Sequence, residues 1–308
     1  MSLSSNTDRI SAIIVSYFPD FGVLLALLRC LALQVDHLIL VDNGGGQLAS
    51  DFFAKEGGKI QYVRMPKNMG LGFALNAGFK QAANFGSKYV ATFDQDSAPA
   101  PHLIAHLRQI HRNMKSQGVL CAAVGPAFFD RREPAKNFFP FYLEDDDGIT
   151  ALFPGESTKI LVQADSLITS GMLVDIGVWT GGIRYQNDLF VDYTDTDWCF
   201  RARAKGYQLF VALDVEMGHA LSDGPPVRFL GFNFFKYSPL RRYYYFRNTV
   251  ALCHAPYVSK AWKRRLATGL VLRFFINIVI DRQRFSSAKM MLRGIRHAIV
   301  GKSGEYAG

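Results

Sequence analysis

Cysteine is scarce in this chain, which has four among 308 residues. Cys30, Cys121, Cys199 and Cys253 lie far apart and form no C-x-x-C pair, the spacing typical of zinc sites and redox motifs. Their apolar or mixed surroundings are typical of buried free thiols. The pattern favours a protein of a reducing, cytosolic compartment over a disulfide-stabilised secreted one.

Long hydrophobic segments are also lacking. Residues 1–8 are polar and the apolar run at 10–15 is typical of a strand, so we expect no signal peptide. The longest late apolar run, residues 266–280, is shorter than the roughly 20 residues that cross a bilayer, and Arg273 lies at its middle. We therefore expect no transmembrane helix and a cytoplasmic location.

Acidic residues are nearly absent from the last part of the chain. Residues 260–302 contain eleven Lys or Arg and the single acid Asp281, a net charge of +10, whereas the whole chain carries +9. Such a mixture of apolar and basic residues is typical of a helix that lies on an anionic membrane surface. Helices that pack on the rest of the chain, a homo-oligomer interface and a nucleic-acid-binding tail are the alternatives.

Short apolar segments alternate with helical ones over the first 129 residues. We expect strands at residues 9–18, 36–46, 59–65, 88–94 and 119–129, and helices at 21–34, 47–57, 69–86 and 101–118. This alternation predicts an α/β fold, with a mainly parallel sheet flanked by helices. Ligands of such sheets bind beyond the carboxyl ends of the strands.

The rest of the chain departs from this rhythm. Residues 130–157 are predicted to be a long surface excursion, 160–175 a strand and 194–206 a helix. After Pro225-Pro226 the composition becomes aromatic and basic. We therefore expect one domain over residues 1–225 and a basic helical segment over residues 226–308.

Carboxylates stand at the ends of several predicted elements. Asp42 follows one strand, Asp94 and Asp96 follow another, and Asp195 and Asp197 open a helix. Each alone is explained as a cap, because Asp favours strand exits and helix starts. The carboxyl ends of parallel strands converge on one rim, however, and this convergence favours a shared site.

The segment Asp94-Gln95-Asp96 is suited to binding a metal ion. Residues i and i+2 of an extended segment point the same way, so both carboxylates can approach one hard cation. Magnesium or manganese bound in this way keeps open positions for the phosphates of a substrate.

Six segments resemble, in order and spacing, the motifs of glycosyltransferase family 2. They are VDNGG (41–45), PKNMGLGFALNAGF (66–79), FDQDS (93–97), SGMLVD (170–175), VDYTDTDWCFRARAKGY (191–207) and GHA (218–220). The Asp-Gln-Asp-Ser sequence and the later RRYYYFRN (241–248) are similar to the bacterial rhamnosyltransferase branch. The resemblance implies a GT-A, Rossmann-like fold for residues 1–225, a nucleotide-sugar donor, a divalent metal and an inverting transfer.

The resemblance also implies which residues bind the nucleotide. Asp42 matches a carboxylate that accepts a hydrogen bond from the pyrimidine ring, and Asn68, Gly70 and Asn76 match the loop and helix that contact the nucleotide. A carboxylate can accept the ring N–H, and glycine lets the backbone approach a ligand closely. The alternative for Asn68 and Gly70 is a cap and turn before the helix that starts near Leu71.

Asp94 and Asp96 match the metal-binding pair of the family, where Asp94 also serves the bound donor, and His219 matches a histidine that completes the metal site. A lone histidine more often has a structural role than a metal-binding one. The D-x-D segment upstream makes a metal-binding role for His219 about as plausible as a structural one. An imidazole ligand suits manganese better than magnesium. The implied cofactor is Mg²⁺ or Mn²⁺.

Asp195 matches the catalytic base of the family, the second residue of a motif usually written Glu-Asp or Asp-Asp. Thr194 replaces the first acid here, which leaves Asp192 as a rival base and Asp197 as a helix-start or supporting carboxylate. A carboxylate can take the proton of an acceptor hydroxyl while that oxygen attacks the anomeric carbon.

Together these features predict an inverting, metal-dependent glycosyltransferase that moves L-rhamnose from dTDP-L-rhamnose to a cell-surface polysaccharide or lipid-linked saccharide. With such an acceptor, residues 260–302 would bring the enzyme to the inner face of the cell membrane as a peripheral protein. A family 2 enzyme that uses a UDP-hexose and a nucleic-acid-binding α/β protein are the alternatives. Arg247 and Asn248 match a family feature to which the resemblance gives no role.

Overall fold

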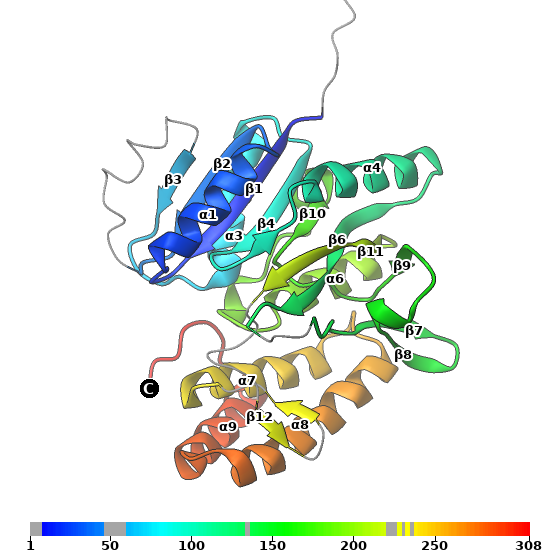
Figure 1. Ribbon diagram of the computed structural model, residues 1–308. Coiled ribbons are helices and arrows are strands. Elements are labelled where there is room, and N and C mark those ends of the chain that lie inside the picture. The colour runs from blue at the N-terminus through cyan, green and yellow to red at the C-terminus, as the bar shows by residue number, and fades with distance from the viewer. Residues whose placement is uncertain (1–7, 46–59, 133–135, 220–226, 230–231, 235–236) are drawn as a thin grey trace, which may run out of the picture.

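We describe the protein from a computed structural model, which covers residues 8–45, 60–132, 136–219, 227–229, 232–234 and 237–308 (Figure 1). The strands are β1 (Ile10–Ser16), β2 (His37–Asp42), β3 (Ile60–Arg64), β4 (Tyr89–Asp94), β5 (Ala98–Pro99), β6 (Cys121–Asp130), β7 (Phe141–Asp145), β8 (Gly148–Leu152), β9 (Leu161–Gln163), β10 (Met172–Asp175), β11 (Gln208–His219), β12 (Val227–Phe229) and β13 (Phe232–Phe234). The helices are α1 (Phe21–Ala32), α3 (Leu71–Asn84), α4 (Leu103–Ser116), α5 (Ile176–Thr180), α6 (Thr194–Ala204), α7 (Pro239–His254), α8 (Lys260–Ile280) and α9 (Arg284–Ile299), with short 3₁₀ turns at Pro154–Glu156 and Asn187–Leu189.

A mixed sheet forms the centre of the α/β part. Its strands follow the order β3-β2-β1-β4-β10-β6-β11-β5, and β9 pairs with β11. Pairing is parallel from β3 to β4 and between β6 and β11, whereas β10 lies antiparallel between β4 and β6. The predicted α/β fold with a mostly parallel sheet is confirmed, and the antiparallel direction of β10 is the feature that the alternation did not indicate.

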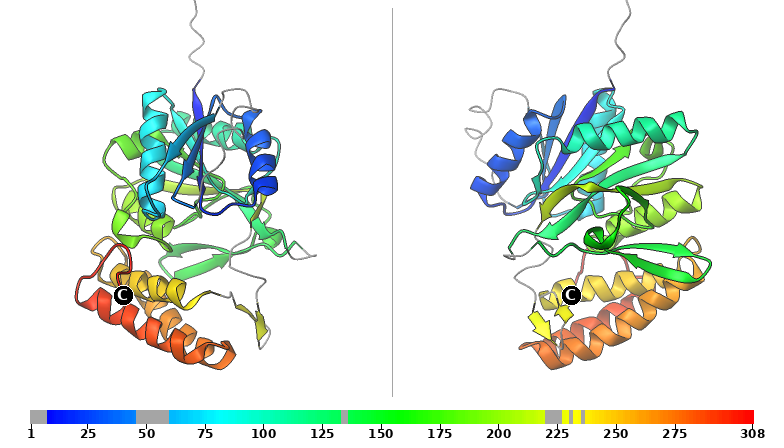
Figure 2. Two further views of the ribbon diagram at one scale, coloured as in Figure 1. Left: turned by 90° about the vertical axis from the view of Figure 1, so that its left-hand side faces the viewer. Right: turned by 45° about the vertical axis from the view of Figure 1, so that its right-hand side comes forward.

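Helices cover both faces of this sheet, as the buried runs of β1, β2 and β4 require. Figure 2 shows α1 and α3 on opposite faces. The end of α1 meets the start of α4, where the Ile104 N–H donates to Gln34 Oε1 over 3.2 Å. Asp20 caps α1, because its carboxylate accepts the N–H groups of Gly22 and Val23.

Two predicted segments have a different structure. Residues 130–157 are not a continuous excursion, because β7 and β8 form a hairpin whose turn is closed by Asp145 Oδ1, an acceptor for the N–H groups of Asp147 and Gly148. The expected strand at 160–175 divides into β9 and β10, and Gly171, with φ +81°, turns the chain immediately before β10. The expected helix at 47–57 and the domain boundary at Pro225-Pro226 lie outside the described residues.

The C-terminal segment is helical from α7 onward, as predicted, and the short strands β12 and β13 precede these helices. Figures 1 and 2 show α7 between the α/β part and an outer layer made of α8 and α9. Helix α9 lies close to α7, because a Cβ atom on Gly294 would be 2.5 Å from the carbonyl oxygen of Tyr243. Among the helices of the described ranges, none is long and apolar enough to cross a membrane.

Asp165 joins the α/β part to α8. This fully buried carboxylate accepts the Trp262 indole N–H over 2.5 Å and the Glu144 N–H over 2.9 Å, and it forms an ion pair with Arg203 of α6 at 2.9 Å. The Trp262 ring also packs on Phe200. One carboxylate thus ties α8, α6 and the β7–β8 hairpin together.

We expect Asp165→Ala to lower the free energy of unfolding by about 3–5 kcal/mol, because it leaves a partly buried guanidinium and two N–H donors without their acceptor. Urea unfolding followed by tryptophan fluorescence measures this loss. Asp147→Ala, on the exposed hairpin turn, is the matched control and should change stability by less than about 0.5 kcal/mol. Equal stability of the two variants would contradict this role of Asp165.

Candidate active site

The sheet brings several predicted residues to one edge. Strand β1 lies between β2 and β4, and its register pairs Ser16 with Asp42 and Val15 with Asp94. Both carboxylates therefore stand beside the end of β1. The long strand β11 ends at His219, which pairs with Asp130 of β6.

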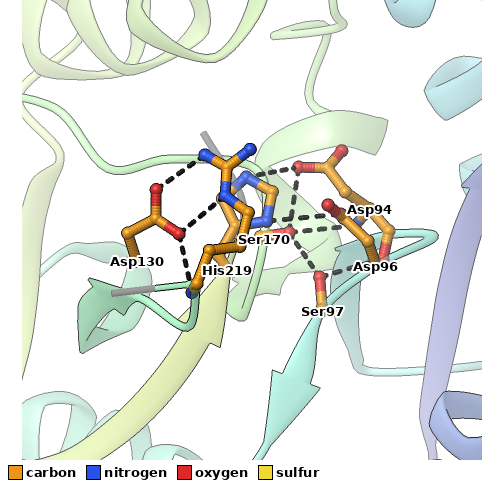
Figure 3. A network of polar contacts seen from close by, with 7 residues as sticks. Asp94, Asp96, Ser97, Asp130, Ser170 and His219 are labelled. Carbon is orange, nitrogen blue, oxygen red and sulfur yellow. Dashed lines mark hydrogen bonds and ion pairs between the residues drawn. The ribbon is translucent and has the colours of Figure 1, made fainter. Parts of the chain in front are cut away.

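His219 lies between the two carboxylates of the D-x-D segment (Figure 3). Its Nε2 is 3.3 Å from Asp94 Oδ2, and its Nδ1 is 3.4 Å from Asp96 Oδ1. The imidazole is buried, whereas both carboxylates are partly exposed. The structure thus brings together the three side chains that the sequence assigns to a metal.

The charges of His219 and its neighbouring carboxylates stabilise one another. Burial lowers the pKa of His219, but the hydrogen bond with Asp96 and the charges of Asp94, Asp96 and Asp130 raise that pKa above its ordinary value. Burial likewise raises the pKa of Asp96, and the contact with His219 together with the charge of Arg131 brings it below its usual value. The His219–Asp96 pair is therefore stabilised in its charged form.

Two carboxylates and an imidazole match the ligands that manganese accepts. Within the part of the chain that the structure describes, no three His, Cys, Asp or Glu side chains are arranged ready to hold a metal ion. The reason is that Asp94 and Asp96 face opposite nitrogens of the same ring. The donor set fits the cation in its chemistry, and its side chains would have to reorient to share one ion.

Asp130 supports the histidine from the other side. Its buried carboxylate accepts the N–H and Nε–H of Arg132 over 3.0 and 2.9 Å and forms an ion pair with the same guanidinium at 2.6 Å. The hydrogen bonds from Arg132 lower the pKa of Asp130. Arg132 thus holds Asp130, which pairs with His219 in the register of β6 and β11.

Ser170 fixes the orientation of Asp94. The Ser170 hydroxyl donates to Asp94 Oδ2 over 2.9 Å and accepts the Asp94 backbone N–H over 3.0 Å. It also lies 2.6 Å from the hydroxyl of Ser97, which donates to the carbonyl of Asp94 (Figure 3). Gly171 is required next to it, because a Cβ there would be 2.8 Å from the sulfur of Met217.

Asp195 occupies the first turn of α6, where it contacts Thr169, the residue before Ser170. Its Oδ2 accepts the N–H of Thr169 over 3.1 Å, and its Oδ1 accepts the N–H of Thr196 over 2.7 Å. Burial raises the pKa of Asp195 to about 6, the two N–H donors oppose this rise, and the negative charge of Asp94 adds to it. A carboxylate with such a pKa is ionised at neutral pH and retains basicity.

The two neighbouring carboxylates have other partners. Asp192, the rival base, forms an ion pair with Arg241 at 3.3 Å. Asp197 is buried and binds Arg201 one helical turn later, at 2.7 Å, while its other oxygen accepts the hydroxyl proton of Tyr257. Asp197 thus has the supporting position that the sequence predicted for it.

The loops after β2 and β3 form a tightly joined pair. Asn43 Nδ2 donates to Asn68 Oδ1 over 3.1 Å, and Asn43 Oδ1 accepts the N–H of Met69 over 2.9 Å. Gly44 has φ +83°, and a Cβ there would lie 2.2 Å from the backbone of Lys67. Asn68 Oδ1 also accepts the Gly70 N–H over 3.0 Å, which is the turn-forming role that we gave as the alternative.

Asp42 is buried at the base of these loops. Its Oδ1 accepts the N–H groups of Gly44 and Gly45, each over 3.1 Å, and its Oδ2 accepts the hydroxyl proton of Tyr62 over 2.7 Å. Tyr62 of β3 thus holds the second oxygen of this carboxylate. The predicted pyrimidine contact of Asp42 stays a prediction, for which the carboxylate has unused acceptor capacity at Oδ2.

The side-chain amide of Asn76, unlike the carboxylate of Asp42, has no unused hydrogen-bonding capacity. Its amide nitrogen donates to Tyr185 O and Asn187 Oδ1, and its amide oxygen accepts from the Trp179 indole and the Tyr185 N–H. All four hydrogen-bonding positions of the amide are therefore occupied. The side chain holds the segment around residues 179–187 against α3, and its predicted nucleotide contact would require some of these bonds to break.

The segment that leads into α6 has an unusual backbone. Phe190, Asp192 and Tyr193 have φ values of 65°, 57° and 64°, a region that costs non-glycine residues about 1–3 kcal/mol each. Gly70 contacts this segment closely, because a Cβ there would lie 2.7 Å from the carbonyl oxygen of Phe190. The N–H of Leu71 donates to the same carbonyl over 2.6 Å.

Arg247 and Asn248 of α7 hold this segment. Asn248 Nδ2 lies 2.9, 2.7 and 3.0 Å from the carbonyl oxygens of Leu189, Val191 and Asp192. Arg247 Nη2 donates to the carbonyl of Leu189 over 2.8 Å, and both side chains are buried. The late motif, for which the sequence gave no role, therefore supports the turn that places Asp195.

Other contacts at this edge of the sheet were not predicted from the sequence. Gln95, between the two acids, accepts the N–H of Tyr17 at Oε1 over 2.7 Å and donates to its carbonyl over 3.2 Å, so it joins the ends of β4 and β1. Tyr17 itself is exposed beside Gly45, whose Cβ would be 2.7 Å from its Cα. Ser170 and Gly171 are the first two residues of the quoted motif SGMLVD (170–175). Their place in that motif was the sequence signal that could have marked them as site residues.

Comparisons with known proteins agree with this arrangement. Residues 11–160 match the family described as Glycosyl transferase family 2. The chain is 28% identical over 297 residues to the dTDP-rhamnosyl transferase RfbF of Shigella flexneri. This alignment covers 96% of this chain and 97% of the relative.

Solved structures of the GT-A type share the fold. S. aureus TarS 1-349 in complex with UDP-GlcNAc has a TM-score of 0.58 at 14% identity, and the alignment covers 96% of this chain and 81% of TarS 1-349. GalNAc-T7 with UDP, GalNAc and Mn²⁺ has a TM-score of 0.56 at 13% identity, and the alignment covers 86% of this chain and 55% of GalNAc-T7.

We expect Asn248→Ala to lower the free energy of unfolding by about 2–4 kcal/mol, because the carbonyls of Val191 and Asp192 lose this donor and that of Leu189 keeps only Arg247. Hydrogen exchange of the amides of residues 189–197 should accelerate selectively, since the strained turn loses its support. Mass spectrometry of exchange measures both effects.

Ser287→Ala is the matched control, because Ser287 is equally buried but hydrogen-bonds Asp281 instead of this turn. It should reduce stability without accelerating exchange at residues 189–197. Unchanged exchange there in Asn248→Ala would contradict the supporting role of Asn248.

Proposed function

This chain belongs to glycosyltransferase family 2, and we propose that it transfers L-rhamnose from dTDP-L-rhamnose, with inversion, to a saccharide acceptor. The observation that carries the choice of donor is the similarity to a dTDP-rhamnosyl transferase over 96% of the chain, which includes the C-terminal helices. The family membership establishes glycosyl transfer from a nucleotide sugar, and it does not favour the nucleic-acid-binding alternative.

We assign the donor diphosphate to the region of Asp94, Asp96 and His219. These three side chains would hold Mg²⁺ or Mn²⁺, which supplies positive charge to the departing diphosphate. A solved GT-A neighbour, GalNAc-T7, contains Mn²⁺. Arg131, close enough to Asp96 to lower its pKa, adds a second positive charge on this side of the site.

The nucleotide would lie over the joined loops after β2 and β3. Glycine at positions 44, 45 and 70 lets these loops pack closely on the backbone of Lys67, Phe18 and Phe190. Asp42 Oδ2 keeps acceptor capacity for a ring N–H. Tyr17 offers an exposed aromatic face at the edge of the same loops. These contacts recognise a pyrimidine nucleotide, and they do not by themselves distinguish dTDP from UDP.

Asp195 is the proposed catalytic base. It takes the proton of the acceptor hydroxyl while that oxygen forms a bond to the anomeric carbon, and the bond from that carbon to the diphosphate oxygen breaks. One displacement inverts the configuration. The N–H groups of Thr169 and Thr196 hold the carboxylate in place, and Ser170, adjacent to Thr169, holds Asp94.

A donor screen tests the sugar-nucleotide assignment. With manganese present, dTDP-L-rhamnose at about ten times its Kd should raise the melting temperature by roughly 2–4 °C, because ligand binding adds about 1.4 kcal/mol to a folded domain of this size. UDP-glucose and UDP-N-acetylglucosamine should give smaller shifts. Stabilisation by the UDP sugars without any by dTDP compounds would overturn the rhamnosyl assignment, and Asp94→Ala should abolish the metal-dependent part of the shift.

We expect Asp195→Asn to lower kcat by about 10²–10⁴-fold, because the amide cannot accept the proton. In the wild type, kcat/KM should rise with pH and level off above about pH 6, since the carboxylate is protonated below its pKa of about 6. Nucleotide release over a pH series measures both. Asp192→Asn is the matched control, and unchanged activity of Asp195→Asn together with loss in Asp192→Asn would transfer the role to Asp192.

A further inference from the structure

The outer layer of the C-terminal segment exposes an unusual number of large apolar side chains. Phe275 is 61% exposed on α8 and Phe285 is 85% exposed at the start of α9. Together with Val271, Leu272, Val279, Leu292, Ile299 and Val300, they make eight exposed large apolar residues on these two helices and the turn that follows. We call this set the outer face of α8–α9.

These residues are arranged in stripes. On α8, Leu272, Phe275 and Val279 are separated by three and four positions, so they share one side of the helix. On α9, Phe285, Leu292 and Ile299 recur every seven residues. The sides of the helices that pack inward carry other side chains, among them the buried Trp262, Leu266 and Met291. Both helices are therefore apolar on two sides, one of which no described residue covers.

Basic side chains accompany the exposed stripes. Lys289 and Arg296 alternate with the apolar residues of α9, Arg284 is its first residue and Arg282 lies in the turn before it, all of them exposed. The net charge of residues 260–302 is +10. Their single acid, Asp281, forms an ion pair with Arg242 of α7, so it offers no compensation to the outer face.

The position of the two helices leaves this face open to a large, flat partner. In Figures 1 and 2, α8 and α9 form the layer farthest from the sheet. Helix α7 lies between α9 and the α/β part, and the start of α8 packs on the α/β part through Trp262. The face is thus directed away from the site at Asp94 and Asp195. A partner could cover it without displacing any element of the α/β part.

We propose that the outer face of α8–α9 docks on an anionic lipid surface, with both helices lying in the plane of the headgroups. A lipid surface provides an apolar layer for the eight side chains and negative headgroups for the arginines and lysines. A second copy would bring two +10 segments together. Nucleic acid would neutralise the charge but offers no apolar layer for the stripes.

Flotation of the full-length protein with lipid vesicles tests this proposal without any donor or acceptor, so its outcome is independent of the proposed enzymatic function. The wild type should float with vesicles of phosphatidylcholine mixed with phosphatidylglycerol, and much less with phosphatidylcholine alone. Added salt should weaken binding. Replacing Lys289 and Arg296 by Gln should reduce the partition coefficient about fivefold per residue, the equivalent of about 1 kcal/mol per basic side chain.

The variant Phe275→Glu with Phe285→Glu should reduce partition by at least about tenfold, because two apolar side chains that would enter the lipid become charged. Its matched control is Leu33→Glu with Ile160→Glu, which makes the same charge change at exposed apolar residues of the α/β part. This control should float nearly as the wild type does. Circular dichroism confirms that both variants are folded.

Three results would overturn the proposal. The first is that the wild type does not float with the anionic vesicles. The second is that the Phe275→Glu, Phe285→Glu variant floats as well as its control, which would leave charge alone as the cause of binding. The third is a dimer of the wild type, seen by light scattering, that this variant dissociates, which would make a second copy the partner.

Discussion

Two adjacent residues, Thr169 and Ser170, determine how the parts of the site stand relative to one another. The Ser170 hydroxyl holds Asp94, and the Thr169 N–H holds Asp195, so one short segment orients both the proposed metal ligand and the proposed base. The segment is fixed in turn by β10, which pairs antiparallel with β4 from Met172 onward. An error of one residue in that pairing would move both carboxylates at once, because the side chains of a strand alternate between faces.

The proposed base, Asp195, depends on a second constraint, which comes from the C-terminal part of the chain. Three non-glycine residues before α6 have positive φ values, and such a turn persists only where its surroundings compensate the strain. Asn248 and Arg247 supply that compensation through the carbonyl groups of residues 188–192. Helix α7 is therefore part of the architecture of the proposed site, and the similarity to a relative along 96% of the chain is consistent with this dependence.

The rim of the site could be predicted from the sequence because it follows from local patterns. Alternating strands and helices place Asp42 and Asp94 at the ends of neighbouring strands, and the observed register has both beside the end of β1. The antiparallel entry of β10 could not be predicted, since its four residues carry no sign of direction. Nor could the contacts of Asn248, whose partners lie 56 to 59 positions earlier and are backbone carbonyls without a sequence signature.

Helix α7 connects the site with the proposed docking surface. One side of it holds the turn before Asp195, and another side receives α9 at Gly294. The helix that supports the turn before the proposed base thus also packs against the helix whose outer face we propose to dock on lipid. The proposed site and the proposed docking surface therefore share one structural support.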